Sequence, residues 1–167
     1  EADLIEEIAR MYGYDEISST LPQASMNLVR GSSRHDRDLK IREVLITQGY
    51  YEAITYSFIE RTTAELIAPD RRLHELSNPI TSEMAVMRTS IWPGLLNAAS
   101  HNLNRQIEDI RLFELGMLFE QVGDELEQRY VLAGLALGKV RELQWGETQR
   151  EVDFYDIKQD LENIIKV

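Results

Sequence analysis

The sequence of 167 residues contains no cysteine, which excludes a disulfide framework and any metal site built from thiolates. Its hydrophobic residues make up 43% of the chain, yet no run approaches the roughly 18 consecutive apolar residues of a membrane-spanning helix. No charged-then-apolar leader marks a secretory signal. We therefore expect a soluble globular protein, without a membrane partner, in a reducing compartment such as the cytoplasm.

An excess of positive charge is also missing. The chain has 18 lysine and arginine residues against 29 aspartate and glutamate residues, for a formal net charge of −11. Such an anion repels nucleic-acid phosphates unless its cations gather on one face. The mild basic enrichment over residues 30–42 falls on a predicted helix that also carries acidic residues. A tRNA-binding module is therefore the least favoured alternative for this chain.

Recognisable catalytic motifs are absent as well. His35, His74 and His101 lie far apart in the sequence, and no pair of them has metal-ligand spacing. Neither a phosphate-binding glycine loop nor the dinucleotide pattern occurs, and there is no G-x-S-x-G elbow. The residues alone therefore predict no catalytic apparatus. A self-contained adenylate-forming enzyme, with an unfamiliar site around Arg88 and Arg111, remains as the alternative.

The N-terminal segment Asp3–Tyr12 has the pattern of a helix that ends at Gly13. Its predicted buried side carries Leu4, Ile5, Ile8 and Met11 or Tyr12. Asp3, Glu6 and Glu7 are spaced i, i+3, i+4, so their carboxylates project from one face. Such a cluster can hold Mg²⁺ through oxygen ligands, but acids also suit the dipole at a helix N-terminus. The spacing by itself favours the second interpretation.

Residues 14–33 lack a clear period and read as a linker, with a domain boundary near residue 20. A second helix is predicted over His35–Gln48, and Gly49 is typical of the position just beyond a helix C-terminus. Its apolar positions are Leu39, Ile41, Val44, Leu45 and Ile46. Because these positions span more than one narrow stripe, we expect contacts on two sides, one with the chain's own sheet and one with a partner chain.

The stretch from residue 78 to residue 120 is the most regular part of the chain. We expect a helix capped by Ser90, with Pro93 as its third residue and an apolar face. That face would consist of Trp92, Leu95, Leu96, Ala99 and Leu103. After it we expect a strand, a tight bend and a returning strand, with Gly116 between two apolar groups. The first group is Ile110, Leu112 and Phe113, and the second is Leu115, Leu118 and Phe119.

Further strands are predicted over residues 51–59 and 130–137, the second buried on both faces, and further helices over 60–67 and 154–167. Helices and strands are thus intermixed, with hairpin-like neighbours. The pattern favours an α+β fold with a mainly antiparallel sheet flanked by helices.

Two long segments, DLIEEIARMYGYDEI and NPITSEMAVMRTSIWPGLLNAASHNLNRQIEDIRLFELGMLF, resemble the bacterial phenylalanyl-tRNA synthetase beta subunit. GYYEAITYSFI and VDFYDIKQDLENII resemble it too, in the same order. The resemblance implies that residues 1–20 end a small preceding domain and its linker. Residues 21–167 would form a core like the catalytic domain of class II aminoacyl-tRNA synthetases, incomplete at its C-terminus.

The resemblance also implies a role. The beta copy of this core is non-catalytic and supports assembly with the alpha subunit, which binds ATP and phenylalanine in an α₂β₂ phenylalanine–tRNA ligase; tRNA is handled by other parts of the enzyme. Glu120 stands where a catalytic core needs a phosphate-binding arginine, and a carboxylate there would repel ATP. Arg88 is expected to be a structural hydrogen-bonding residue. The interface candidates are Leu39, Ile41, Val44 and Leu45, with the helix over 90–104 as a second surface.

The family's beta subunit carries one Mg²⁺ near its alpha interface. Transferred position by position, this implies Asp3, Glu6 and Glu7 as ligands, with a fourth ligand upstream of this sequence. The resemblance therefore favours the metal interpretation that the spacing alone does not.

Overall fold

The computed structural model describes residues 1–21, 33–141 and 143–166. Its contacts divide the chain into two compact units, Glu1–Gly31 and Ser32–Val167. Most of the predicted linker over residues 14–33 lies outside the described residues. The domain boundary near residue 20 stays a prediction.

The first unit consists of helix α1 (Ala2–Tyr12) and a 3₁₀ turn, η1 (Tyr14–Glu16). The predicted helix and its end are confirmed, because Gly13 adopts φ 102° and its N–H donates to Ala9 O at 2.9 Å. A residue with a Cβ is strained at that φ. The predicted buried side of the helix is exposed within this unit, with Leu4 at 69% and Ile8 at 68%.

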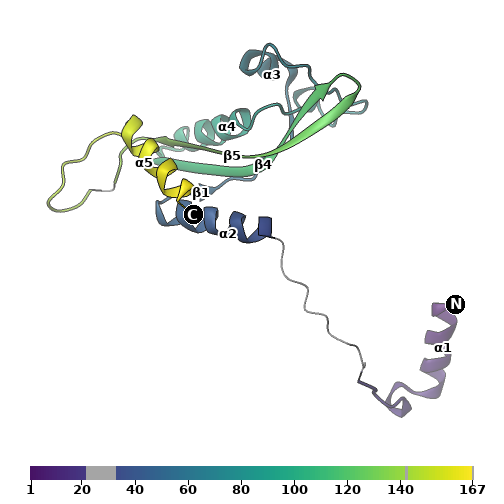
Figure 1. Cartoon of the computed structure of the whole chain (residues 1–167). Helices are drawn as coiled ribbons and strands as arrows, with labels where there is room; N and C mark the ends of the chain where they lie inside the picture. Colours follow the sequence, from purple (N-terminus) through teal and green to yellow (C-terminus); the bar gives the residue numbers. More distant parts are fainter. Residues whose placement is uncertain (22–32, 142, 167) are drawn as a thin grey trace. The chain divides into compact units, whose positions relative to one another are not determined.

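The second unit is built on a long antiparallel hairpin (Figure 1). Strands β4 (Ile110–Val122) and β5 (Glu125–Leu137) pair along their whole length, and β1 (Tyr51–Glu52) joins the other edge of β4 in parallel. A separate antiparallel pair consists of β2 (Phe58–Ile59) and β3 (Val86–Met87). The predicted α+β class is confirmed, and of the strand pairs in the described residues only β1 with β4 is parallel.

Two strand predictions were wrong, for a shared physical reason. The expected bend at Gly116 does not exist, because β4 is continuous. A Cβ at Gly116 would overlap the guanidinium of Arg88, so this glycine provides space rather than a turn. The hairpin turns instead at Gly123, with φ 61°. The single strand expected over 51–59 is split between two sheets, with Thr55 in the intervening segment engaged by the same guanidinium.

The expectation that strand 130–137 is buried on both faces was also wrong. Leu135 is buried, but Gly134 and Leu137 are exposed. Both faces of the hairpin are covered only in part. The apolar run over residues 130–137 therefore reflects burial at a few positions, and not a central position of this strand in a large sheet.

Helices cover the two faces of the hairpin differently. Helix α4 (Trp92–Leu103) lies on one face, and α2 (Ser33–Thr47) and α5 (Phe154–Ile165) lie on the other (Figure 1). The α4 side has a core of Ile91, Leu95, Ala99, Ile110 and Leu135. The opposite core consists of Leu45, Tyr50 and Phe113, with Ile41 and Ile164 packed against it. The short elements α3 (Arg61–Ile67) and η2 (Ser82–Met84) lie beside β2 and β3 in sequence.

The ends of the helices follow their sequence signals in part. Asp153 begins α5 with a capping box that is closed by Asp156. Helix α4 begins at Trp92, with Ile91 as its N-cap, so the predicted cap at Ser90 was wrong by one residue. The Ser90 hydroxyl nevertheless accepts a hydrogen bond from the Trp92 N–H at 3.2 Å.

The predicted apolar face of α4 is only partly buried. Leu95 and Ala99 are in the core, whereas Trp92, Leu96 and Leu103 are each close to half exposed. This helix therefore keeps an apolar strip on its outer side. None of the described helices is both long and apolar enough to cross a membrane.

Candidate functional site: a buried arginine beside an open cleft

Arg88, which follows β3, has a buried charged side chain that is 4% exposed, as is that of its partner Glu114. Its Nη1 lies 2.6 Å from Glu114 Oε1 and donates to Thr55 Oγ1 at 3.0 Å. Its Nε donates to Met117 O at 2.9 Å. The Thr55 hydroxyl in turn donates to Glu114 Oε2 at 2.7 Å. The charge of Arg88 is thus neutralised by Glu114, and its Nη1 and Nε are hydrogen-bonded to groups of the chain itself.

The backbone of Arg88 joins the two sheets. Its N–H donates to Ser57 O at 2.9 Å, and its carbonyl accepts from the Phe119 N–H at 2.9 Å. Gly116 leaves the space that the guanidinium fills. Because Nε and Nη1 are both engaged, neither edge of the guanidinium offers two free donors with which to bind a phosphate. This placement agrees with the predicted structural role of Arg88.

Arg111 and Glu114, the partner of Arg88, are three positions apart on β4. Because successive side chains of a strand alternate between its two faces, Arg111 lies on the face opposite to Glu114. Its guanidinium lies 3.3 Å from Asp160 Oδ2 and donates to Val140 O at 3.2 Å. Tyr50 donates its hydroxyl to the same Asp160 at 2.8 Å. Burial of Tyr50 and this hydrogen bond raise the pKa of its phenol. The cluster fastens α5 to the sheet, and the structure does not bring Arg88 and Arg111 together in one site.

Glu120 lies near the far end of β4. Its carboxylate pairs with Arg71 and lies 3.7 Å from Arg129. The negative charge that was expected to repel ATP is therefore held between two arginines of the chain.

An open cleft of about 860 Å³ lies beside the buried arginine, with Thr55 in its wall. Asn97 and His101, one turn apart on the polar side of α4, line it together with Glu60 and Glu83. The remaining walls are mostly apolar: Ile54, Tyr56, Phe58, Ile59, Met84, Pro93 and Ala98. Sequence reasoning missed this cleft, because residues from four separate segments form it. The i, i+4 pair on α4 was the only local signal.

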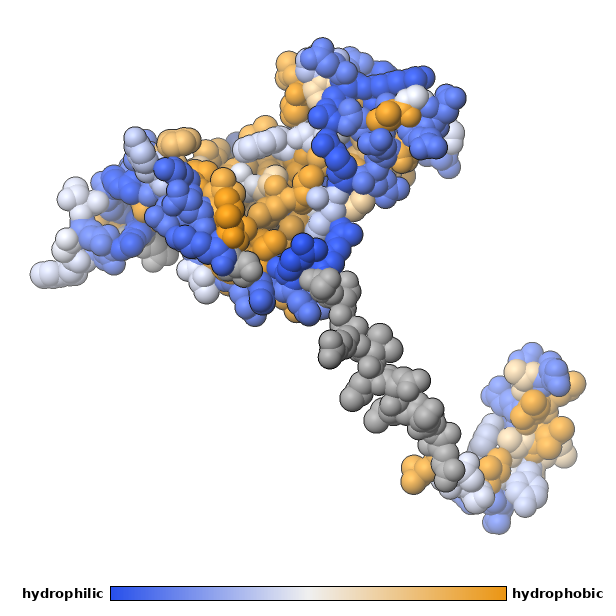
Figure 2. Space-filling view, viewed as in Figure 1, coloured by the Kyte–Doolittle hydropathy of each residue, from blue (hydrophilic) through white to orange (hydrophobic). Residues whose placement is uncertain are grey.

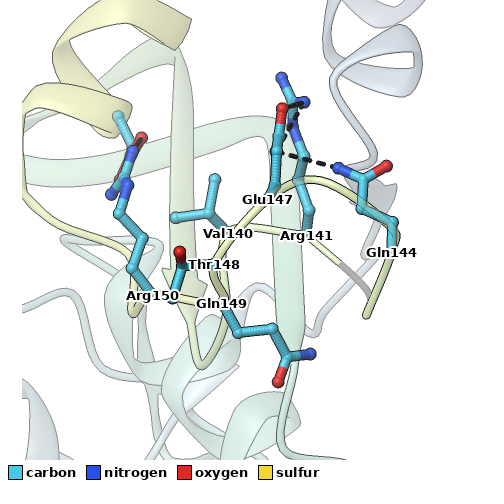
Figure 3. Close-up of a pocket in the computed structure, with 8 residues that line it drawn as sticks. Val140, Arg141, Gln144, Glu147, Thr148, Gln149 and Arg150 are labelled. Carbon is cyan, nitrogen blue, oxygen red and sulfur yellow. Dashed lines mark hydrogen bonds and ion pairs between the residues drawn. The ribbon is translucent and has the colours of Figure 1, made fainter.

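A smaller pocket of about 200 Å³ lies in the connection between β5 and α5 (Figure 3). Arg141 pairs with Glu147 at 3.0 Å, and Arg150 contacts both carboxylate oxygens of Asp156 at 2.6 Å. Arg150, with the backbone N–H of Asp153, lowers the pKa of Asp156 to about 2. The Arg141–Glu147 pair lies within the connection, and the Arg150–Asp156 pair links the connection to the first turn of α5. Because its charges are paired internally, the pocket offers little to a ligand.

The three predicted metal ligands lie on α1, where all are exposed. Glu7 pairs with Arg10. Among the described residues, no group of three histidine, cysteine or acidic side chains has an arrangement that could hold a metal ion. The donor chemistry of Asp3, Glu6 and Glu7 suits Mg²⁺, but their carboxylates do not converge here.

The four interface candidates on α2 divide into two groups. Leu45 is buried in the chain's own core, and Ile41 packs against that core. Leu39 is 44% exposed, and Val44 is partly buried. Leu45 is thus unavailable to a partner, because it already supports the sheet, and Leu39 is the most open of the four.

The arrangement of the chain is similar to that of solved structures. Two structures of pyrrolysyl-tRNA synthetase from Desulfitobacterium hafniense match 80% of this chain, with TM-scores of 0.56 and 0.53 and identities of 17% and 18%. The match covers 45% and 44% of those chains. The chain therefore shares its fold with part of these aminoacyl-tRNA synthetases.

Sequence comparison defines the family more narrowly. The family model described as "Phenylalanyl tRNA synthetase beta chain CLM domain" matches residues 17–167. Phenylalanine–tRNA ligase beta subunits of Coxiella burnetii and Methylococcus capsulatus are 45% and 44% identical over 96% and 99% of this chain. The chain belongs to the phenylalanyl-tRNA synthetase beta chain family. It spans about a fifth of the length of these relatives.

Proposed function

We propose that this chain is a non-catalytic, synthetase-like domain of a phenylalanine–tRNA ligase beta subunit. It supports the alpha subunit in the α₂β₂ enzyme that attaches phenylalanine to its tRNA with ATP. The observation that carries the proposal is the enclosure of Arg88 by Glu114 and Thr55. An arginine whose charge is neutralised inside the fold cannot stabilise the phosphates of an adenylate-forming reaction.

The assembly role is supported by an apolar surface between α5 and α2 over the hairpin, which Figure 2 shows. A groove of about 190 Å³ opens there, lined mainly by Tyr50, Phe113, Leu132, Ile157, Leu161 and Ile164. Leu39 and Ile46 on α2 are exposed. An apolar surface of this kind is typical of a stable subunit interface, whose centre is poor in charge.

The test compares the full-length beta subunit alone, the alpha subunit alone and the two together. Phenylalanine-dependent exchange of pyrophosphate into ATP should require the alpha subunit, and beta alone should show neither exchange nor micromolar ATP affinity by calorimetry. Either activity in beta alone would favour the adenylate-forming alternative.

For the interface, Leu39→Asp should weaken association of the two subunits in sedimentation experiments. Leu66→Asp is the matched control, because Leu66 is an exposed leucine on α3. Equal association of both variants would remove α2 from the interface.

We also propose Mg²⁺ at α1, held by Asp3, Glu6, Glu7 and a further oxygen ligand. The donor set supports a hard cation, whose bound charge would offset the repulsion among the three carboxylates. Asp3→Ala combined with Glu7→Ala should reduce the Mg²⁺ dependence of subunit assembly. Asp15→Ala with Glu16→Ala serves as the control, since these acids belong to η1. Unchanged sedimentation across Mg²⁺ concentrations would contradict the site.

The tRNA-binding alternative is disfavoured by the net charge of −11. It predicts RNA binding by residues 1–167 with a steep salt dependence, which a gel shift at low salt tests. Under our proposal tRNA is bound by other parts of a cytoplasmic enzyme.

A further inference from the structure

The open cleft between α4 and the segment 54–60 has the dimensions of a recognition site. Its volume of about 860 Å³ lies within the range of roughly 300–1,000 Å³ that is typical of ligand pockets. The floor is closed where Gly94 on α4 meets the Thr55 side chain so closely that a Cβ on Gly94 would overlap it. Thr55 is itself held by Arg88 and Glu114. The cleft therefore has a fixed floor and an open top.

The cleft is lined by acidic side chains. Glu60 and Glu83 line it and are exposed, and neither takes part in an ion pair among the described residues. The nearest arginine in sequence, Arg61, is engaged by Glu65 and Glu75 on α3 and before β3. Among the residues that the structure describes, no lysine or arginine lines the cleft. A cationic group can therefore enter without displacing a cation of the chain.

The walls are suited to an apolar chain that carries such a cation. Ile54 is 92% exposed and Tyr56 is also exposed, although both lie in a segment anchored at each end by the sheets. The anchors are the Ala53 N–H to Phe113 O and the Ser57 O to Arg88 N–H hydrogen bonds. Aromatic rings attract a guanidinium or ammonium group, and the Met84 thioether adapts its shape to apolar side chains.

We propose that this cleft is a docking site for an extended segment of a second polypeptide, one that carries a lysine or arginine next to an apolar side chain. Exposed carboxylates raise the rate at which an oppositely charged partner finds a site in solution. A segment of the same polypeptide chain would be present at high local concentration without that help. The acidic rim therefore fits a partner that arrives by diffusion. The choice of that partner, the alpha subunit, rests on the proposed function.

The test uses the full-length beta subunit expressed together with the alpha subunit. A photoreactive benzoylphenylalanine replaces Ile54, a position open enough to accept it without repacking. The matched control places the same group at Leu66, which is 82% exposed and does not line the cleft. Irradiation of the assembled enzyme should link position 54, and not position 66, to an alpha-subunit peptide that mass spectrometry shows to contain lysine or arginine.

The carboxylates give a second readout. Glu60→Gln with Glu83→Gln should reduce the yield of this cross-link about threefold or more at low salt and subsaturating alpha subunit, since each exposed charge pair contributes modestly. The difference should shrink at high salt. Glu65→Gln, which alters an acid on α3 outside the cleft, should leave the yield unchanged.

Several results would overturn the inference. They are no cross-link from position 54, a cross-link to RNA or to the beta chain itself, a linked peptide without a basic residue, or a yield that the two glutamine substitutions do not change. If the enzyme assembles but the cross-link fails, the docking site is wrong while the proposed function stands. If the subunits do not associate at all, the proposed function itself fails.

Discussion

The buried ion pair between Arg88 and Glu114 allows a quantitative test of how this core is held together. The side chains are each 4% exposed, and the charged atoms lie 2.6 Å apart. At an effective dielectric constant near 20 the attraction over that distance is about 6 kcal/mol, most of which offsets the loss of hydration. Removing one partner should therefore be far more damaging than the net value of the pair, because the remaining charge stays buried.

We expect Glu114→Gln to lower the free energy of unfolding by about 3–5 kcal/mol. Glutamine keeps the shape and can still accept from Thr55, so the change isolates the charge. Arg88→Met should cost a similar amount, because it also leaves Met117 O without its donor. A loss of this size corresponds to roughly 10 °C in Tm for a chain of this length.

Urea denaturation followed by circular dichroism measures these changes, and the double variant completes the cycle. Arg88→Met with Glu114→Gln should be more stable than the sum of the single changes by about 3 kcal/mol, since neither charge is left alone. The control pair is Arg42 with Glu52, whose side chains are each 28% exposed at 2.9 Å. The corresponding cycle there should give about 1 kcal/mol or less. Equal coupling energies for the two pairs would refute the reasoning.

Three further outcomes are expected. The pKa of Asp156 should be about 2 in carboxyl NMR, and Arg150→Met should return it toward the ordinary range. Because the pKa in the folded state lies below that in the unfolded state, the Asp156 carboxylate stabilises the fold above about pH 4. That contribution is lost as the pH falls toward 2. An unshifted carboxyl would contradict the pairing with Arg150. Gly94→Ala should lower stability by about 1–3 kcal/mol through overlap with Thr55, whereas Ser100→Ala on the exposed side of the same helix should change it little; thermal denaturation distinguishes them. Tyr50→Phe should lower the free energy of unfolding by about 1 kcal/mol, the typical net contribution of a hydrogen bond. An unchanged urea midpoint would show that the hydrogen bond from Tyr50 to Asp160 does not stabilise the fold.

Much of the local structure could be predicted because its signals are themselves local. The apolar period and Gly13 predict α1, and the apolar period over the last residues predicts α5. Such signals act within one or two turns of chain, so reading them needs no knowledge of the tertiary contacts. The family follows from long segments of specific sequence in the same order, and the comparisons confirm it.

The errors concern residues whose environment comes from elsewhere in the chain. Gly116 was interpreted as a turn because glycine and flanking apolar groups are typical of one. In the structure it makes room for the side chain of Arg88, 28 positions earlier in the sequence. Leu45 was assigned to a partner surface, because a helical period shows which residues share a face but not what covers that face.

The candidate cleft was equally beyond sequence reasoning. Its walls come from the segment around Ile54, from α3, from η2 and from α4, and no spacing in the chain relates them. Folding alone brings Asn97 and His101 of α4 into one cleft with Glu60.

The sequence by itself therefore determined the family, the α+β class, most helices and the presence of an arginine at position 88. The tertiary structure alone decided what that arginine does. Placed where its guanidinium meets Glu114 and Thr55 out of reach of water, it stabilises the junction of two sheets. The physical reason is that the role of a charge depends on which groups surround it in space, and those groups come from segments that the chain brings together only on folding.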